Sequence, residues 1–331
     1  MALTAPGTAG SLGSSVTERD AVWQRGLAWV EAQLPEFILP RPLDPDDVFP
    51  LKALGELARA ADLLCRPRDL PVETQSRARA LLEFAWGQFG EGRLFVELLE
   101  QRPWPVLGTM YSIFEPHGFD HQGARQALAR LVGPGGLTLK QMAPQPRQTP
   151  RQPLTRYGPD GAAVLALALA LAWRVVSLAS PWSEQRLFPH TALAKCPRVD
   201  ELDDGQAYSL THAVFFMTDF GSRPQDLPVS CREYLADNAP RWAEAFLRRS
   251  NHDLFAELAL ACCCAGGQAA WAEAGLGASQ AQDGLVPGPG LRSPELVARA
   301  TPERRRFLEN YHTTLAAIMA SFGVTVGLER R

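Results

Sequence analysis

The chain has 331 residues, of which 46% are hydrophobic and 21% are charged, and its formal net charge is −3. This composition provides enough apolar material for a large core. The balanced charge, without a basic stripe, argues against a nucleic-acid partner. The cysteines are too few and too unevenly spaced for a secreted disulfide framework, which predicts reduced thiols and a cytoplasmic location. They are Cys65, Cys196, Cys231, Cys262, Cys263 and Cys264.

The first fifteen residues are rich in Ala, Thr, Gly and Ser and have neither a basic nor an apolar region. We therefore expect residues 1–15 to be a disordered leader rather than a signal peptide. The most apolar stretch is Ala162–Ala179, in which Arg174 interrupts the apolar run. Because the unbroken part is well short of the ~20 residues that a membrane span needs, we expect a buried helix and no membrane contact.

Apolar residues recur at helical spacing between Pro and Gly residues along almost the whole chain. A capping box at Ser15–Glu18 starts a helix that Pro35 ends, and Pro50 and Pro71 open the next two helices. Further helices are predicted at Leu94–Glu100, Val106–Phe114, Gly123–Leu131, Ala162–Leu178, Ala207–Phe220, Cys231–Arg248, Asp253–Cys264, Gln268–Ala274 and Pro294–Phe322.

Alternating apolar and polar runs that would indicate strands are missing from the sequence, so the predicted fold class is all-α. Residues 16–331 are expected to form a single helical domain, with a long Pro-rich loop at 133–153. Paired helices with Pro and Gly turns over most of the chain favour helical hairpins arranged as an α/α toroid or barrel.

The strongest candidate site lies on the helix predicted at 207–220. His212 and Asp219 are seven residues apart, which places them two turns apart on one helical face, and Tyr208 and Thr211 lie on that face as well. Polar groups on an otherwise apolar helix can line a pocket. The alternative is a hydrogen-bonded polar ladder in the core, with Asp219 in a C-terminal turn.

Two further helices carry polar groups that could join this site. Asp253 and Glu257 are four residues apart and share a face, and His312 precedes an apolar run in the C-terminal helix. In a toroid, parallel inner helices would bring such positions to the same end of a central cavity. Otherwise, each residue makes its own local cap or carbonyl bond.

We therefore predict a general acid–base site or a mixed histidine and carboxylate metal site, with the metal and any cofactor unknown. The predicted catalytic residues are His212, Asp219, Asp253, Glu257 and His312. The predicted substrate-binding residues are Tyr208, Thr211 and Tyr311.

Two other groups of potential metal ligands are weaker. Zinc sites use spaced cysteines, so the consecutive Cys262–Cys264 are expected to be small buried residues. Glu115, His117 and His121 follow a helix and could reach one cation, although an ordinary polar turn is the favoured interpretation.

The segment Gln280–Val286, with the sequence QAQDGLV, resembles the Q-x-x-x-G-x-W turn of α/α-toroid proteins such as triterpene cyclases, with Val286 in place of Trp. The resemblance implies a toroid, a shape that lanthionine cyclases also use. Their metal signature of two separated cysteines and a Cys-His pair is missing here. Asp44–Asp47 has the letters of the D-x-D-D proton donor of class II terpene cyclases, but it lies in an acidic linker ahead of a helix.

From about residue 50 onwards the chain also resembles an uncharacterised all-helical family from actinomycetes. The resemblance is carried by Tyr208–Gly221, which has the pattern Y-x-L-T-H-A-x-F-x-x-T-D-F-G, and by Asp253–Glu257 and Tyr311–Thr314. It implies an association with natural-product gene clusters and no known activity.

The first functional hypothesis is a tailoring or accessory enzyme of bacterial specialised metabolism that acts on a small molecule or a peptide. The alternatives are a non-catalytic helical scaffold that binds a peptide or a partner enzyme, and a terpene-type cyclase. The sequence alone does not decide whether the protein is an enzyme.

Overall fold

The computed structural model describes residues 21–44, 49–66, 70–101, 105–132, 160–180, 182–198, 202–290 and 300–328. All regular secondary structure in these ranges is helical, which confirms the predicted all-α class. The predicted leader at 1–15, the capping box at Ser15–Glu18 and the Pro-rich loop at 133–153 lie outside the described residues, as does Asp44–Asp47 apart from Asp44.

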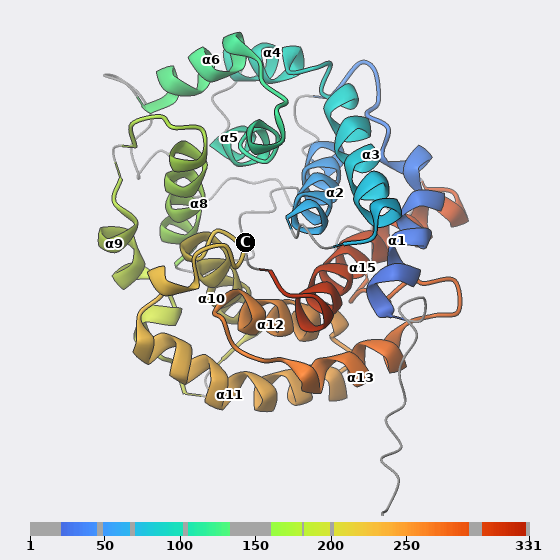
Figure 1. Ribbon diagram of the computed structural model, residues 1–331, viewed down its shortest axis with the longest axis vertical. Helices are drawn as coiled ribbons and strands as arrows, with labels where there is room; N and C mark the ends of the chain where they lie inside the picture. The colour runs from blue at the N-terminus through green and yellow to red at the C-terminus, as the bar shows by residue number, and fades with distance from the viewer. Residues whose placement is uncertain are drawn as a thin grey trace, which may run out of the picture.

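The helices form an inner and an outer layer (Figure 1). The inner layer consists of α2 (Phe49–Cys65), α5 (Pro105–Tyr111), α8 (Gly161–Val175), α10 (Asp204–Met217), α12 (His252–Cys264) and α15 (Pro302–Thr325). Each of these helices contacts the next in this order, and α15 packs back against α2. The inner helices therefore surround a common centre (Figure 1).

The outer layer covers the inner helices in chain order. It consists of α1 (Val22–Ala32), α3 (Val72–Gln88), α4 (Arg93–Gln101), α6 (Gln122–Val132), α9 (Glu184–Leu187), α11 (Val229–Arg248) and α13 (Ala270–Ser279). Helix α3 packs on α2, α9 on α8, α11 on α12, and α1 on α15. Consecutive helices thus alternate between the two layers over much of the chain.

Helix α8 is buried along nearly its whole length, as its apolar run predicts. It ends at Val175, earlier than predicted, because Ser177 has a left-handed backbone conformation. Arg174 lies at this end of the helix, and its Nη1 is 2.7 Å from Glu184 Oε2. No helix among the described residues is long and apolar enough to cross a membrane.

The turn that begins at Gln280 follows α13 and is hydrogen-bonded to the start of α1. The Gln280 side-chain amide donates to the carbonyl of Val22 at 2.9 Å and to that of Gly284 at 2.8 Å, and its Oε1 accepts from Arg25 Nε at 2.8 Å. Gly284 has φ +97°, and a Cβ there would lie 2.1 Å from the Arg25 carbonyl oxygen. Val286, at the position of the motif's Trp, is fully buried. The turn therefore fixes the N-terminal helix to the rest of the fold.

Candidate functional site

Asp253 lies in the first turn of α12 and is fully buried. It does not cap the helix, because the Asn251 side chain accepts from the Leu254 N–H instead. Asp253 Oδ2 accepts a hydrogen bond from the Tyr208 hydroxyl, and Oδ1 accepts one from the Thr313 hydroxyl at 2.9 Å. This carboxylate therefore connects three inner helices, α10, α12 and α15.

Glu257 follows one turn later on the same face of α12, and its side chain is 4% exposed. Its Oε2 accepts from the Thr211 hydroxyl at 2.6 Å and lies 3.5 Å from His212 Nδ1. That ring nitrogen lies 2.9 Å from the Tyr208 carbonyl oxygen. Since a carbonyl only accepts, His212 Nδ1 carries a hydrogen and donates it. Burial lowers the pKa of His212, and the nearby Glu257 carboxylate opposes this shift.

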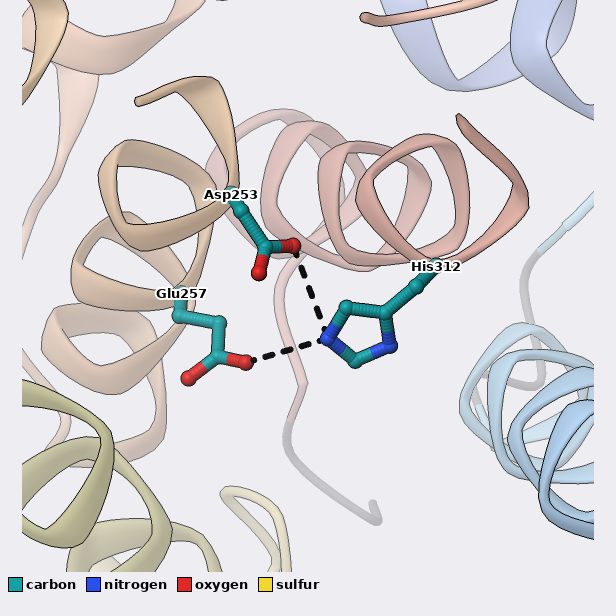
Figure 2. Close-up of side chains that lie close together, drawn as sticks. All are labelled: Asp253, Glu257 and His312. Atoms are coloured by element: carbon teal, nitrogen blue, oxygen red, sulfur yellow. Dashed lines mark ion pairs between the residues drawn. The ribbon is translucent and has the colours of Figure 1, made fainter. Parts of the chain in front are cut away.

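His312 on α15 faces both carboxylates. Its Nε2 lies 3.5 Å from Asp253 Oδ1 and 3.4 Å from Glu257 Oε1 (Figure 2). On the other side of the ring, Nδ1 lies 3.1 Å from Glu56 Oε2 on α2, and Lys52 pairs with the second oxygen of Glu56. The cluster therefore draws side chains from four inner helices.

Burial and charge act in opposite directions on this part of the cluster. Burial alone would lower the pKa of His312, but the Asp253 and Glu56 carboxylates raise it to about 9. Burial would likewise raise the pKa of Glu56, but His312 and Lys52 hold it well below its usual range. With only these side chains around it, His312 is therefore positively charged near neutral pH.

The structure brings together four of the five predicted catalytic residues, namely His212, Asp253, Glu257 and His312. The predicted substrate-binding residues Tyr208 and Thr211 hold the two carboxylates of this cluster.

Sequence reasoning missed Glu56, Lys52 and Thr313. Lys52 and Glu56 have the spacing of an ordinary surface ion pair, so no local signal marks them. Thr313 lies in the segment 311–314 that carries the family resemblance, but no sequence pattern predicts a role for its hydroxyl.

Asp219 does not join this cluster. Helix α10 ends at Met217, because the Thr218 hydroxyl donates to the Val214 carbonyl at 2.8 Å and accepts from the Gly221 N–H at 3.2 Å. Asp219 then has a left-handed backbone with φ +49°. The prediction that one helical face carries both Asp219 and His212 is therefore wrong, since the helix ends before it reaches Asp219.

Asp219 instead contacts a buried arginine. Arg66, which follows α2, directs its Nη1 to the carbonyl oxygens of Asp219 at 2.8 Å and Phe220 at 3.0 Å, and to Ser222 Oγ at 2.8 Å. Its Nη2 lies 3.6 Å from Asp219 Oδ1 and donates to Asp62 Oδ2 at 2.7 Å. This contact joins the C-terminal ends of α2 and α10.

Asp62 is the second carboxylate at this end of the inner helices. It also accepts from Arg59 Nη1 at 2.7 Å, and His117 Nε2 lies 2.8 Å from its Oδ1. Burial would raise the pKa of Asp62, but Arg66, His117 and Arg59 hold it well below its usual range. We call this group the Arg66 clamp, and it consists of Arg59, Asp62, Arg66, His117, Asp219 and Ser222.

Tyr311 lies beside His312 in the chain, but its ring is in the core. The ring stacks on Phe307 with centroids 5.1 Å apart and packs edge-on against Phe37 and Phe49. The structure thus gives Tyr311 a packing role, whereas the sequence suggested contact with a substrate.

Neither of the two weaker candidates brings three ligand atoms together among the described residues. Burial raises the pKa of the Cys262 and Cys263 thiols to about 12, so these thiols stay protonated near neutral pH. Glu115 pairs with Arg125, while His117 belongs to the Arg66 clamp. Within the described ranges, the three side chains that could hold a metal ion together are Asp253, Glu257 and His312.

A family model described as a domain of unknown function, DUF6895, matches residues 23–322 of the chain. The chain belongs to this family. The matched region contains both the cluster around Asp253 and the Arg66 clamp, so both are parts of the DUF6895 domain itself. No curated protein and no solved structure matches the chain.

Proposed function

We propose that the protein is an enzyme that modifies a small molecule or a peptide at the cluster formed by Tyr208, His212, Asp253, Glu257 and His312. The observation that carries this proposal is the burial of two carboxylates beside two histidines, with contributions from separate helices. Removing carboxylates from water costs several kcal/mol per ion. Apolar side chains of similar volume would stabilise the fold as well. Buried clusters of titratable groups are concentrated at functional sites.

The partial exposure of the histidines supports the same proposal. The side chains of His212 and His312 keep 18% and 23% of their surface accessible, whereas both carboxylates are almost completely buried. A substrate could therefore approach the cluster from the histidine side. A non-catalytic scaffold would bind its partner through an apolar surface, which these charged side chains do not provide.

We further propose that the two helical layers form an α/α toroid. The supporting observations are the closed order of contacts in the inner layer and the alternation of inner and outer helices along the chain. In such a toroid the cluster would lie towards the N-terminal ends of the inner helices, and the Arg66 clamp would close the opposite end.

The biological setting that we propose is a tailoring step in bacterial specialised metabolism. This part rests on the sequence resemblance alone, and the cytoplasmic location likewise stays a prediction.

The proposal is tested by incubating the purified protein with small-molecule and peptide extracts of bacteria that encode it, followed by mass spectrometry. We expect at least one component to be converted by the wild-type protein and not by Glu257→Gln, which keeps the side-chain shape. Glu244→Gln is the matched control, because Glu244 is exposed on α11. Equal conversion by Glu257→Gln, or no conversion by the wild-type protein in any extract, would contradict the proposal.

A further inference from the structure

We infer that Asp253, Glu257 and His312 bind a divalent metal ion, with zinc as the best fit. As a catalytic centre this metal site rests on the proposed function, but metal binding itself can be measured without any substrate. Four observations support the inference. They are the distances between the ligand atoms, a ring nitrogen of His312 without a hydrogen bond, the contacts of the ligand side chains' remaining polar atoms, and the excess negative charge of the cluster.

The spacing of the ligand atoms fits a metal ion better than direct hydrogen bonds. His312 Nε2 lies 3.4 Å from Glu257 Oε1 and 3.5 Å from Asp253 Oδ1, and one ligand atom from each residue lies within 4.8 Å of the other two. Charge-assisted hydrogen bonds are shorter, at about 2.7–2.9 Å. In a tetrahedral zinc site with bonds of about 2.0–2.1 Å, neighbouring ligand atoms lie about 3.3–3.4 Å apart.

The ring nitrogen that faces both carboxylates makes no hydrogen bond among the described residues. His312 Nε2 is buried and has no hydrogen-bond partner within the part of the chain that the structure describes. Buried polar atoms in folded proteins almost always have such a partner, so an exception calls for an explanation. A metal ion between Nε2 and the two carboxylates (Figure 2) would accept the nitrogen lone pair and provide that partner.

The remaining polar atoms of the three ligands are held in place by other side chains. His312 Nδ1 faces Glu56 Oε2 at 3.1 Å. The Tyr208 hydroxyl donates to the outer oxygen of Asp253, and the Thr211 hydroxyl donates to that of Glu257 at 2.6 Å. Metal-binding histidines usually donate their second nitrogen to a carboxylate, and metal-binding carboxylates are themselves hydrogen-bonded.

The charge of the cluster also calls for a cation. Three carboxylates, on Asp253, Glu257 and Glu56, face one lysine, Lys52. With a neutral His312 the group carries two excess negative charges, which one divalent ion would balance. One imidazole and two carboxylates, without a thiolate, form a ligand set that suits zinc with a fourth position open for water or substrate. Such an ion would act as a Lewis acid.

Metal content is measured by mass spectrometry of the protein after chelator treatment and reloading with Zn²⁺, and affinity by competition with a chromophoric chelator. We expect about one zinc ion per chain for the wild-type protein and for the exposed control Glu244→Gln. His312→Gln should bind at least about 100-fold more weakly because it loses a ligand. Glu56→Gln should bind about 10–100-fold more weakly because it loses only an outer contact.

Loading with Co²⁺ gives a readout of coordination that is independent of affinity. We expect visible absorption bands of a tetrahedral Co²⁺ site in the wild-type protein and not in His312→Gln. If that variant does not fold by circular dichroism, Thr211→Val provides the test, since it removes only the hydroxyl that holds Glu257 and should weaken zinc about 10-fold or more.

The outcomes of these experiments separate the metal site from the proposed function. A wild-type protein that binds no Zn²⁺ or Co²⁺ at micromolar concentrations would overturn the metal inference, as would variants with wild-type affinity. Conversion of a substrate in the presence of chelator would leave the enzyme proposal standing and remove the metal. Zinc binding without any conversion would leave the metal site and remove the enzyme proposal.

Discussion

Replacing Arg66 by Met removes the centre of the clamp that joins the C-terminal ends of α2 and α10. The Arg66 side chain is 1% exposed, pairs with Asp62 at 2.7 Å, and donates to two backbone carbonyls and the Ser222 hydroxyl. Met fills most of the volume but has no donor. In the variant, the buried Asp62 carboxylate loses one of its positively charged partners, and the Asp219 and Phe220 carbonyl oxygens lose the hydrogen bonds that Arg66 donates.

The expected loss follows from the burial of the pair. Removing one partner of a buried ion pair costs about 3–5 kcal/mol, because the other charge stays buried. With an unfolding entropy of about 2.1 cal/mol/K per residue, a chain of this length has about 0.7 kcal/mol/K. The melting temperature of Arg66→Met should therefore fall by about 4–7 °C, which calorimetry can measure.

Arg248→Met is the matched control for this experiment. Arg248 pairs with Glu244 at 2.9 Å on the surface, and both side chains are about two-thirds exposed. Exposed pairs contribute at most about 1 kcal/mol, so the control should shift the melting temperature by no more than about 1.5 °C. If the two variants melt at the same temperature, the Arg66 clamp does not carry the stability that its burial implies.

Two further predictions concern backbone strain and pH. Gly284→Ala should destabilise the fold by about 2 kcal/mol or more in urea unfolding, because the new Cβ would meet backbone 2.1 Å away at φ +97°. Gly118→Ala, at φ +79° with open space around the Cβ, should lose only about 1 kcal/mol, and equal losses would contradict the clash. The pKa of Asp62 is lowered, so its stabilisation is present above its unfolded pKa of about 3.9 and is lost as pH falls through the lower folded value. The difference in unfolding free energy between wild type and Asp62→Asn should therefore shrink below about pH 4. A constant difference down to about pH 2 would show that the ion pairs of Asp62 with Arg59, Arg66 and His117 do not stabilise the fold.

Local signals predicted where many helices begin. Helices α2 and α3 start next to Pro50 and Pro71, as expected from the fixed φ of proline and its missing N–H. The last helix was predicted from Pro294, but residues 291–299 lie outside the described ranges, and α15 begins at Pro302 after Thr301. The Thr301 hydroxyl accepts from the Arg304 N–H at 3.2 Å, which is an N-cap that the sequence Thr-Pro-Glu already signals.

Helix ends and cross-helix partners were harder to predict. The end of α10 depends on one hydroxyl, that of Thr218, which bonds to the backbone on both sides of the turn and stops the helix ahead of Asp219. Glu56 could not be recognised from its spacing to Lys52, because the same i,i+4 pair is common on helix surfaces. Its contact with His312 depends on which face of α2 is turned towards α15, and no local pattern specifies that.

The two buried charge clusters show why spacing could not distinguish a structural role from a functional one. Both contain carboxylates and at least one histidine, from inner helices or from the turns that follow them, so their residue types look alike in the sequence. They differ in charge balance. Among the described residues, two carboxylates face two arginines in the Arg66 clamp, whereas around His312 three carboxylates face one lysine.

A balanced cluster satisfies its own charges and can be explained by stability alone. An unbalanced one needs a proton, as the raised pKa of His312 indicates, or a cation from outside. This balance is a property of the assembled helices, since Glu56 and Asp253 lie far apart in the sequence. We therefore propose a stabilising role for the cluster that contains Asp219 and ligand binding for the cluster that contains Asp253, whereas the sequence predicted both aspartates in one site.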